Sequence, residues 1–446
     1  MNISRRRRQL SAVAVAGVSA LALGACSPGG SGDGGDGGSS DGETTTVTFR
    51  LWDEAAAAAY QESFDAFTSE NPDVTVEIET VPWANYWERL PQDIGSGTMA
   101  DIFWTNTSNF GIYADNGNLL NITDELGEDH DAWTRSIVDL YTRDGSLWGV
   151  PQLSDSIALF YNKDIVDAAG IDPTALYWDP SGEGDTFLPA AQQLTVDSAG
   201  VTAAQEGFNP DDVAQWGFNA QNDLQAIYID FLASNGGQFQ VGDDYAFSSP
   251  EGVEAFQYVV DLINTNHVSP SAADTSQNGD LARDLFVQGK MAFFQSGQYS
   301  LPAMADADFT WGLAPMLEGP EGRVGVVHGV AAVGNAATEH SEATVEVLRW
   351  LGSAAGQEAL GANGAAFPAA TDAQHTFTDY WTEQGMDTQV FLDAAEGDNA
   401  PAPLGPNSNA GLNAIDPIFA EMFAGRISVP DALAQAQDAG NEAIQE

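Results

Sequence analysis

Hydrophobic and polar positions alternate with a period of two from Val47 to Trp52, and this pattern predicts a β-strand. Residues 54–71 then place apolar side chains at helical spacing, and Pro72 predicts that the helix ends before it. Residues 74–81 alternate again and predict a second strand. A strand, a helix and a strand at this spacing predict a βαβ unit, whose parallel strands belong to an α/β sheet.

Later segments repeat both patterns. Residues 99–106 predict a third strand whose polar end points outward. Residues 249–266 predict a capped helix, and residues 341–361 and 429–444 predict further helices. The chain has no internal repeat of the solenoid type, so we expect a globular α/β fold.

The first residues have the features of an export signal. Four arginines, Arg5–Arg8, precede an apolar run over residues 10–25 that stops at Cys26, which predicts a leader peptide over residues 1–25. Residues 23–26 resemble the lipobox of bacterial lipoproteins, so Cys26 is the expected lipidation site. The alternative is an incidental thiol beside an ordinary secretory cleavage site. Cys26 is the chain's single cysteine, which leaves no internal disulfide.

Residues 26–45 are rich in Gly, Ser and Asp and predict a flexible, lipid-anchored tether. A Gly-rich coil of this length has a root-mean-square reach of about 24 Å. No later apolar run has membrane length, so we expect contact with the membrane through the anchor only.

Size and charge narrow the class further. Without the leader the chain has about 420 residues, more than one core usually holds, which predicts two lobes. The chain has 14 Lys and Arg against 65 Asp and Glu, a net charge of −51. Basic residues form no cluster after the leader, which argues against nucleic acid as a partner. We interpret the acidity as a solvated surface; the alternative is a cationic ligand such as a polyamine.

Several strand ends carry candidate binding residues. Trp52 and Asp53 end the first strand, Trp83 follows the second, and Trp104 and Asn106 end the third. Ligands of α/β sheets bind at the carboxyl ends of strands. A sugar needs flat apolar rings beside polar groups, because its C–H faces pack on aromatic rings while its hydroxyls need hydrogen-bond partners. Each tryptophan alone could equally be a core residue.

Longer motifs, in order along the chain, extend this interpretation. They are ADIFWTNTSNFGIYADNGNLLNIT (100–123), DGSLWGVPQLSDSIALFYNKDIVDAAGI (144–171), GKMAFFQSGQYSL (289–301), WGLAPMLEGPEGRVGVVHGVAAVG (311–334) and GRISVPDALAQAQDAGNEAIQ (425–445). Together they resemble the extracellular solute-binding proteins of ABC importers, the family that includes the maltose-binding protein.

The resemblance implies a bilobal α/β clamshell of the type II periplasmic-binding-protein kind. Three crossings would join its lobes, near Val150–Gln152, Gly319–Arg323 and Phe367–Ala370. The expected lobes are an N-terminal lobe of residues 46–152 plus 323–368, and a C-terminal lobe of residues 153–322 plus 369–446.

The same resemblance implies roles for individual residues. Trp104 matches an aromatic residue that stacks on the sugar, and Asp155 matches an acidic residue that accepts hydrogen bonds from its hydroxyls. Tyr299 would stack from the second lobe, or could be a core residue. The remaining candidates are expected polar contacts, with helix capping or a buried histidine as alternatives: Asn222, Asp223 and His328.

The expected function is the extracytoplasmic substrate-binding component of an ABC importer. As a lipid-anchored monomer on the outer face of a Gram-positive, actinobacterial cell, it would capture a mono- or oligosaccharide and deliver it to membrane permease subunits. No Gly-x-Ser-x-Gly, His-Glu-x-x-His or Walker motif is present, so we expect no enzyme, cofactor or metal site. The alternatives are a receptor for polyamines or other amino compounds, and a secreted glycoside hydrolase that uses two of the many carboxylates.

Overall fold

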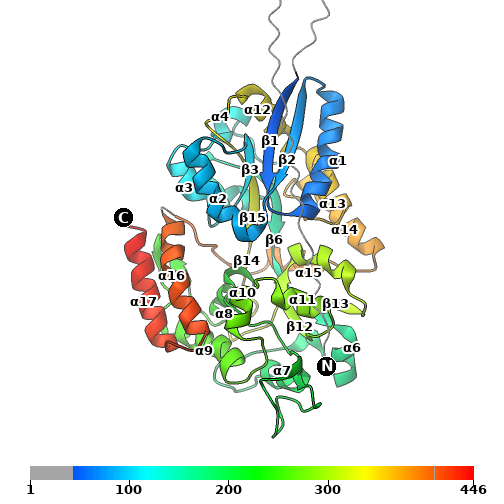
Figure 1. The fold of residues 1–446 in the computed structure, drawn as a ribbon, viewed down its shortest axis with the longest axis vertical. Helices are drawn as coiled ribbons and strands as arrows, with labels where there is room; N and C mark the ends of the chain where they lie inside the picture. The colour runs from blue at the N-terminus through cyan, green and yellow to red at the C-terminus, as the bar shows by residue number, and fades with distance from the viewer. Residues whose placement is uncertain (1–43, 406, 446) are drawn as a thin grey trace, which may run out of the picture. The chain divides into compact units, whose positions relative to one another are not determined.

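The computed structural model describes residues 44–405 and 407–445 (Figure 1). The predicted leader, the lipidation site at Cys26 and nearly all of the predicted tether lie outside the described residues. The described residues form one compact unit.

A five-stranded sheet organises the first part of this unit. Its strands, in spatial order, are β2 (Val74–Thr80), β1 (Thr45–Leu51), β3 (Ile102–Asn106), β15 (His328–Gly334) and β6 (Val150–Asp155). Strand β1 is parallel to β2 and β3, whereas β15 is antiparallel to β3 and β6.

The predicted βαβ unit is confirmed. Helix α1 (Glu54–Glu70) joins β1 to β2 and ends before Pro72. Helix α2 (Trp83–Ser96) then joins β2 back to β3, on the other edge of β1. Right-handed crossovers in opposite directions place α1 and α2 on opposite faces of the sheet, as Figure 1 shows. The carboxyl ends of β1 and β3 therefore flank a topological switch point, the usual place for a ligand in such sheets.

This sheet has its own hydrophobic core. Val47, Phe49 and Leu51 of β1 are fully buried, because every second residue of the strand points toward the covering helices. The ring of Phe49 lies edge-on to Tyr60 of α1, with centroids 5.0 Å apart. Helices α12 (Ser341–Leu351) and α13 (Ala354–Ala362) complete this layer and confirm the helices predicted over residues 341–361. We call this part the first lobe.

A second, smaller sheet has the order β12 (Phe293–Gly297), β7 (Ile157–Asn162) and β13 (Trp311–Pro315), and both of its pairings are antiparallel. Helices contact it on its faces. Helix α9 (Pro250–Asn264), which Ser249 caps as predicted, packs in the hydrophobic core that this sheet shares. The remaining helices used below are α8 (Ile229–Ser234), α11 (Leu281–Val287), α15 (Gln389–Glu396), α16 (Ser408–Phe423) and α17 (Val429–Ala443). We call this part the second lobe.

The chain changes sheets at defined positions. Strand β6 remains in the first sheet to Asp155 and β7 begins in the second sheet at Ile157, so Ser156 alone joins them. On the return, β14 (Gly325–Val326) still pairs with β16 (Asn399–Ala400) before β15 enters the first sheet at His328. Residues 367–369 run beside β6, where Ser154 donates its backbone N–H to Phe367 and Gln152 accepts one from Ala369.

Candidate functional site

Four tryptophans meet at the carboxyl ends of β1 and β3. The ring centroid of Trp52 is 5.0 Å from that of Trp104, 5.3 Å from that of Trp83 and 5.3 Å from that of Trp87. The predicted trio of Trp52, Trp83 and Trp104 is thus brought together, and α2 adds Trp87. We call these four residues the tryptophan cluster.

The members of the tryptophan cluster differ in exposure. Trp83 is 52% exposed, whereas Trp104 is 1% exposed because Trp52 and Tyr60 cover it. The indole N–H groups of Trp87 and Trp104 are buried and meet no acceptor among the described residues. The stacking role of Trp104 would require its ring to be uncovered and stays a prediction. The exposed ring in this structure is that of Trp83.

Asn106, at the end of β3, belongs to a chain of amides that joins the two lobes. Its side-chain oxygen accepts a hydrogen bond from the amide of Asn109, 2.7 Å away. Asn109 in turn accepts a hydrogen bond from Asn409 of α16 in the second lobe. The Asn409 oxygen is buried and has no partner among residues 44–405 and 407–445.

Asp53 caps a helix of the first lobe and lies close to a cation of the second lobe. Its carboxylate caps α1 by accepting a hydrogen bond from the backbone N–H of Ala56 at 2.7 Å. Burial raises the pKa of Asp53, while the helix N–H groups and the charge of Arg283 from α11 oppose that rise. Asp53 therefore lies within electrostatic reach of the second lobe.

Asp155 ends β6 beside His328, its register partner on β15. Its side chain is 9% exposed, and its carboxylate makes no hydrogen bond within the described part of the chain. Burial, followed by the charge of Asp53, raises the pKa of Asp155 to about 7. A carboxylate in this setting can accept hydrogen bonds from hydroxyl groups.

His328 is buried, and its Nε2 atom meets no partner among the described residues. Burial lowers the pKa of this imidazole to about 4, so the ring is neutral at neutral pH. A neutral imidazole nitrogen can donate or accept one hydrogen bond with a hydroxyl group.

Tyr299 supplies an aromatic ring from the second lobe. It is 40% exposed, yet the surrounding protein raises the pKa of its phenol, and the charges of Asp223 and Asp155 add to that rise. The ring packs over Gly297, where an added Cβ would lie 2.2 Å from Cε1 of Tyr299. Gly297 therefore has to be glycine for Tyr299 to take this position.

Polar groups accompany Tyr299. Asp223 caps the short helix over Leu224–Tyr228 by accepting a hydrogen bond from Ala226 at 2.7 Å, and burial raises its pKa. Asn222 is exposed. The side-chain oxygen of Gln221 and the side-chain nitrogen of Gln225 are buried without partners in the described residues.

The predicted residues of both lobes are therefore close enough for their charges to interact. The charge of Asp53 raises the pKa of Asp155, and the charges of Asp155 and Asp223 raise the pKa of Tyr299. Sequence reasoning missed several polar groups and one ring in this region. They are Trp87, Gln221, Gln225 and Arg283. The spacing of four residues between Trp83 and Trp87, on one helix face, was a signal that could have revealed Trp87.

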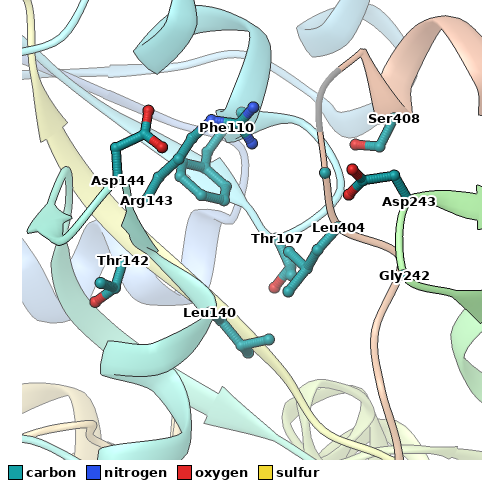
Figure 2. Close-up of a pocket in the computed structure, with 12 residues that line it drawn as sticks. Thr107, Phe110, Leu140, Thr142, Arg143, Asp144, Gly242, Asp243, Leu404 and Ser408 are labelled. Atoms are coloured by element: carbon teal, nitrogen blue, oxygen red, sulfur yellow. The ribbon is translucent and has the colours of Figure 1, made fainter. Parts of the chain in front are cut away.

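A separate cavity of about 420 Å³ is lined by residues of both lobes (Figure 2). Thr107, Phe110 and Arg143 contribute from the first lobe, and Asp243 and Ser408 from the second. None of the ligand-binding residues predicted from the sequence lines this cavity. We therefore assign the candidate site to the strand ends, where the tryptophan cluster and the unpaired polar groups lie.

The described residues contain neither a metal cluster nor a membrane-spanning helix. No group of three or more His, Cys, Asp or Glu is placed to hold a metal ion in that part of the chain. No helix there is long and apolar enough to cross a membrane.

Comparison with known proteins connects this geometry to a family. The structure resembles UspC of M. tuberculosis, with 47% identity and a TM-score of 0.70 over 90% of this chain and all of that one. An ABC substrate-binding protein from Listeria monocytogenes, solved with cycloalternan, has 21% identity and a TM-score of 0.77 over 90% of this chain and 99% of that one. The maltodextrin-binding protein MdxE of Bacillus subtilis is 25% identical over 59% of this chain and 58% of its own length.

These likenesses confirm the predicted fold class, the bilobal α/β fold of solute-binding proteins. The family model described as bacterial extracellular solute-binding protein matches residues 52–358, which include β3, β6, β7 and β15 of the two sheets. On that match and on the UspC likeness, this chain belongs to the bacterial extracellular solute-binding protein family.

Proposed function

We propose that the protein is the extracytoplasmic substrate-binding component of an ABC importer and that it binds a neutral mono- or oligosaccharide between its lobes. The observation that carries this proposal is the placement of exposed and half-buried tryptophan rings beside unpaired acceptors and donors at the switch point of the first sheet. The relatives whose names refer to maltodextrin and cycloalternan support the choice of a carbohydrate.

The chemistry of a sugar fits this arrangement. The C–H faces of a pyranose pack on aromatic rings, and Trp83 and Tyr299 offer exposed rings from opposite lobes. Each buried polar group without a partner costs about 1–3 kcal/mol, and a hydroxyl group can both donate and accept. Binding would therefore satisfy the indole N–H of Trp87 and the imidazole of His328. The carboxylate of Asp155, which is 9% exposed, would accept hydrogen bonds from the sugar's hydroxyl groups.

Charge argues against a polyamine. Three carboxylates, Asp53, Asp155 and Asp223, lie near the proposed ligand, and the guanidinium group of Arg283 is close enough to act on one of them, Asp53. A pKa of about 7 also leaves Asp155 partly protonated at neutral pH. A cage for a cation would instead use several ionised carboxylates without a competing guanidinium group.

The proposed mechanism is closure of the two lobes around the ligand. A ligand that contacts both lobes stabilises the closed form by its differential affinity, and a micromolar Kd corresponds to about −8 kcal/mol. We place the first hinge at Ser156 rather than at the predicted Val150–Gln152, because β6 stays in the first sheet to Asp155. The second hinge is at Val327, after the predicted Gly319–Arg323, and the third keeps the predicted residues 367–370. The closed form would present the sugar to permease subunits, with the protein a monomer anchored through Cys26.

The test is a binding screen on purified protein. Neutral mono- and oligosaccharides should raise the melting temperature and reduce the radius of gyration in small-angle scattering, and they should be recovered uncut. The variant Trp83→Ala should show a weaker response at the same sugar concentration, while Val241→Ala, at an equally exposed apolar residue (53%), should respond as the wild type does. A response to spermidine alone, cleavage of the sugar, or no response to any solute would refute the proposal.

A further inference from the structure

A buried glutamine of the second lobe contacts the crossover between the lobes and has no place in the site described so far. Gln298 is 4% exposed and directly precedes Tyr299. Its side-chain oxygen accepts a hydrogen bond from the backbone N–H of Ser156 at 2.7 Å. Its side-chain nitrogen donates a hydrogen bond to the backbone carbonyl of Ser154 at 3.0 Å. One amide therefore holds the residues on both sides of Asp155.

These two bonds join different parts of the fold. Ser154 belongs to β6 in the first sheet, whereas Gln298 follows β12 in the second sheet. Ser156 is the single residue between β6 and β7, and its hydroxyl group also donates a hydrogen bond to the carbonyl of Phe391 in α15 at 2.7 Å. The Gln298 side chain thus fixes the backbone at the point where the chain leaves the first lobe.

Asp155 needs such support. Its carboxylate makes no hydrogen bond within the described residues, so no polar contact of its own side chain sets its direction. The position of that carboxylate depends on the backbone at residues 154–156, and Gln298 holds this backbone from both ends. Removing a buried hydrogen-bond partner also leaves backbone groups unsatisfied, which favours rearrangement of that segment.

The same glutamine is tied to the aromatic side of the site. Gly297 pairs with Ile157 in the β12–β7 ladder, on the other side of Ser156. The ring of Tyr299 lies over Gly297, with no room for a Cβ between them. The segment 297–299 therefore contacts the crossover through its backbone pairing and through the Gln298 side chain, while it presents Tyr299 to the ligand.

We propose that Gln298 is a positioning residue that couples Asp155 of the first lobe to Tyr299 of the second, so that both contact one ligand in a fixed relative arrangement. This inference rests on the proposed function for its ligand. Gln298 itself acts through backbone groups and does not touch the sugar.

The test compares two buried glutamines with similar bonding. Gln357 is fully buried, and its amide makes hydrogen bonds to the backbone of Pro151, Leu351 and Ala370. Gln298→Leu and Gln357→Leu should both lower the melting temperature. Only Gln298→Leu should weaken sugar binding, by about tenfold, when affinity is measured well below the melting temperature. Gln298→Glu keeps the acceptor for Ser156 and should lie between wild type and Gln298→Leu.

A second readout needs no ligand. Carbon-13 NMR of the Asp155 carboxyl and the Tyr299 ring in the free protein should show both signals shifted by Gln298→Leu and Gln298→Glu, and neither shifted by Gln357→Leu. If Gln298→Leu does not fold, Gln298→Glu carries the test. Unmoved Asp155 and Tyr299 signals in a folded Gln298 variant would overturn the inference. Failure of the wild type to bind any sugar would overturn the proposed function and leave this NMR test valid.

Discussion

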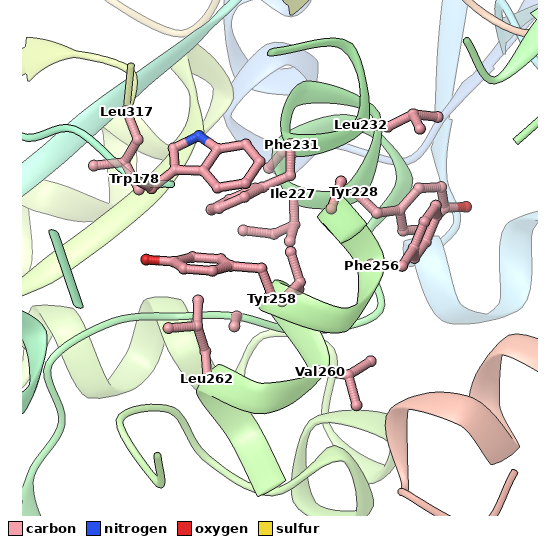
Figure 3. Close-up of a cluster of buried hydrophobic side chains, with 14 of the residues drawn as sticks. Trp178, Ile227, Tyr228, Phe231, Leu232, Phe256, Tyr258, Val260, Leu262 and Leu317 are labelled. Atoms are coloured by element: carbon pink, nitrogen blue, oxygen red, sulfur yellow. The ribbon is translucent and has the colours of Figure 1, made fainter. Parts of the chain in front are cut away.

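Two aromatic clusters in this protein have nearly the same packing and different surroundings. In the second lobe, the ring centroid of Trp178 is 4.8 Å from that of Phe231 and 5.0 Å from that of Tyr258, and all three residues are buried (Figure 3). The hydroxyl group of Tyr258 donates a hydrogen bond to Asp185 at 2.8 Å. In this cluster the rings are buried, and the Tyr258 hydroxyl group has a hydrogen-bond partner.

The tryptophan cluster of the first lobe differs in just those respects. Its centroids are as close, 5.0–5.3 Å from Trp52, but Trp83 is half exposed and the indole N–H groups of Trp87 and Trp104 have no acceptor in the described chain. Ring distances therefore do not separate a core from the proposed binding surface. Exposure and unpaired polar atoms do, because a stable core leaves few such atoms.

The largest expected effect is on the second-lobe cluster. Trp178→Ala should lower the free energy of unfolding by about 3–5 kcal/mol, because it removes a fully buried ring and leaves a cavity. Chemical denaturation measures this change. Sugar affinity of the folded variant should stay at the wild-type value, and a large loss of affinity would show that the two clusters are not independent.

The next largest effect is on the pH dependence of stability. It comes from Asp155, whose pKa is about 7 in the folded state and near 3.9 in the unfolded state. The folded state then binds more protons between about pH 4 and pH 7, so the free energy of unfolding should fall as pH rises through this window. The slope should approach about 1.4 kcal/mol per pH unit.

Asp155→Asn should remove that slope and weaken sugar binding. Denaturant unfolding at several pH values checks the slope. The matched control is Asp101→Asn, since hydrogen bonds from Thr338 and Thr48 outweigh burial and lower the pKa of Asp101. The Asp101 carboxylate therefore stabilises the fold above its unfolded pKa, and this contribution is lost as the pH falls. A wild-type slope that persists in Asp155→Asn would contradict the assignment.

Trp83→Ala should affect sugar affinity and hardly affect stability, which is the opposite of what we expect for Trp178→Ala. Because the ring is 52% exposed, the free energy of unfolding should change by less than about 1 kcal/mol, while sugar affinity should fall by about tenfold. Calorimetry on wild type, Trp83→Ala and Val241→Ala measures both quantities. An affinity equal to wild type would remove Trp83 from the site.

The smallest expected effect comes from Gly297→Ala, which should displace the Tyr299 ring and lower affinity by a few-fold up to about tenfold. Gly279→Ala is the control, since a Cβ there meets nothing within 4 Å. Fluorescence titration with the best sugar compares the two variants. Equal affinities would mean that the ligand does not contact Tyr299.

The sequence by itself determined the α/β class, the βαβ unit at the start of the body, the helices over residues 249–266 and 341–361, and the family. These follow from periodicity, capping residues and motif order, which are properties of short segments. It also placed Trp52, Trp83 and Trp104 at neighbouring strand ends, because the carboxyl ends of parallel strands meet at one edge of a sheet.

Only the tertiary structure decided which of those residues are exposed and which atoms lack partners. Trp104 is covered because Tyr60 of α1 and Trp52, which follows β1, pack on it. The contact between Gln298 and residues 154–156 joins segments more than 140 positions apart. Burial and hydrogen bonding depend on all the segments that surround a side chain. Sequence spacing describes one segment at a time, so it could not reveal these features.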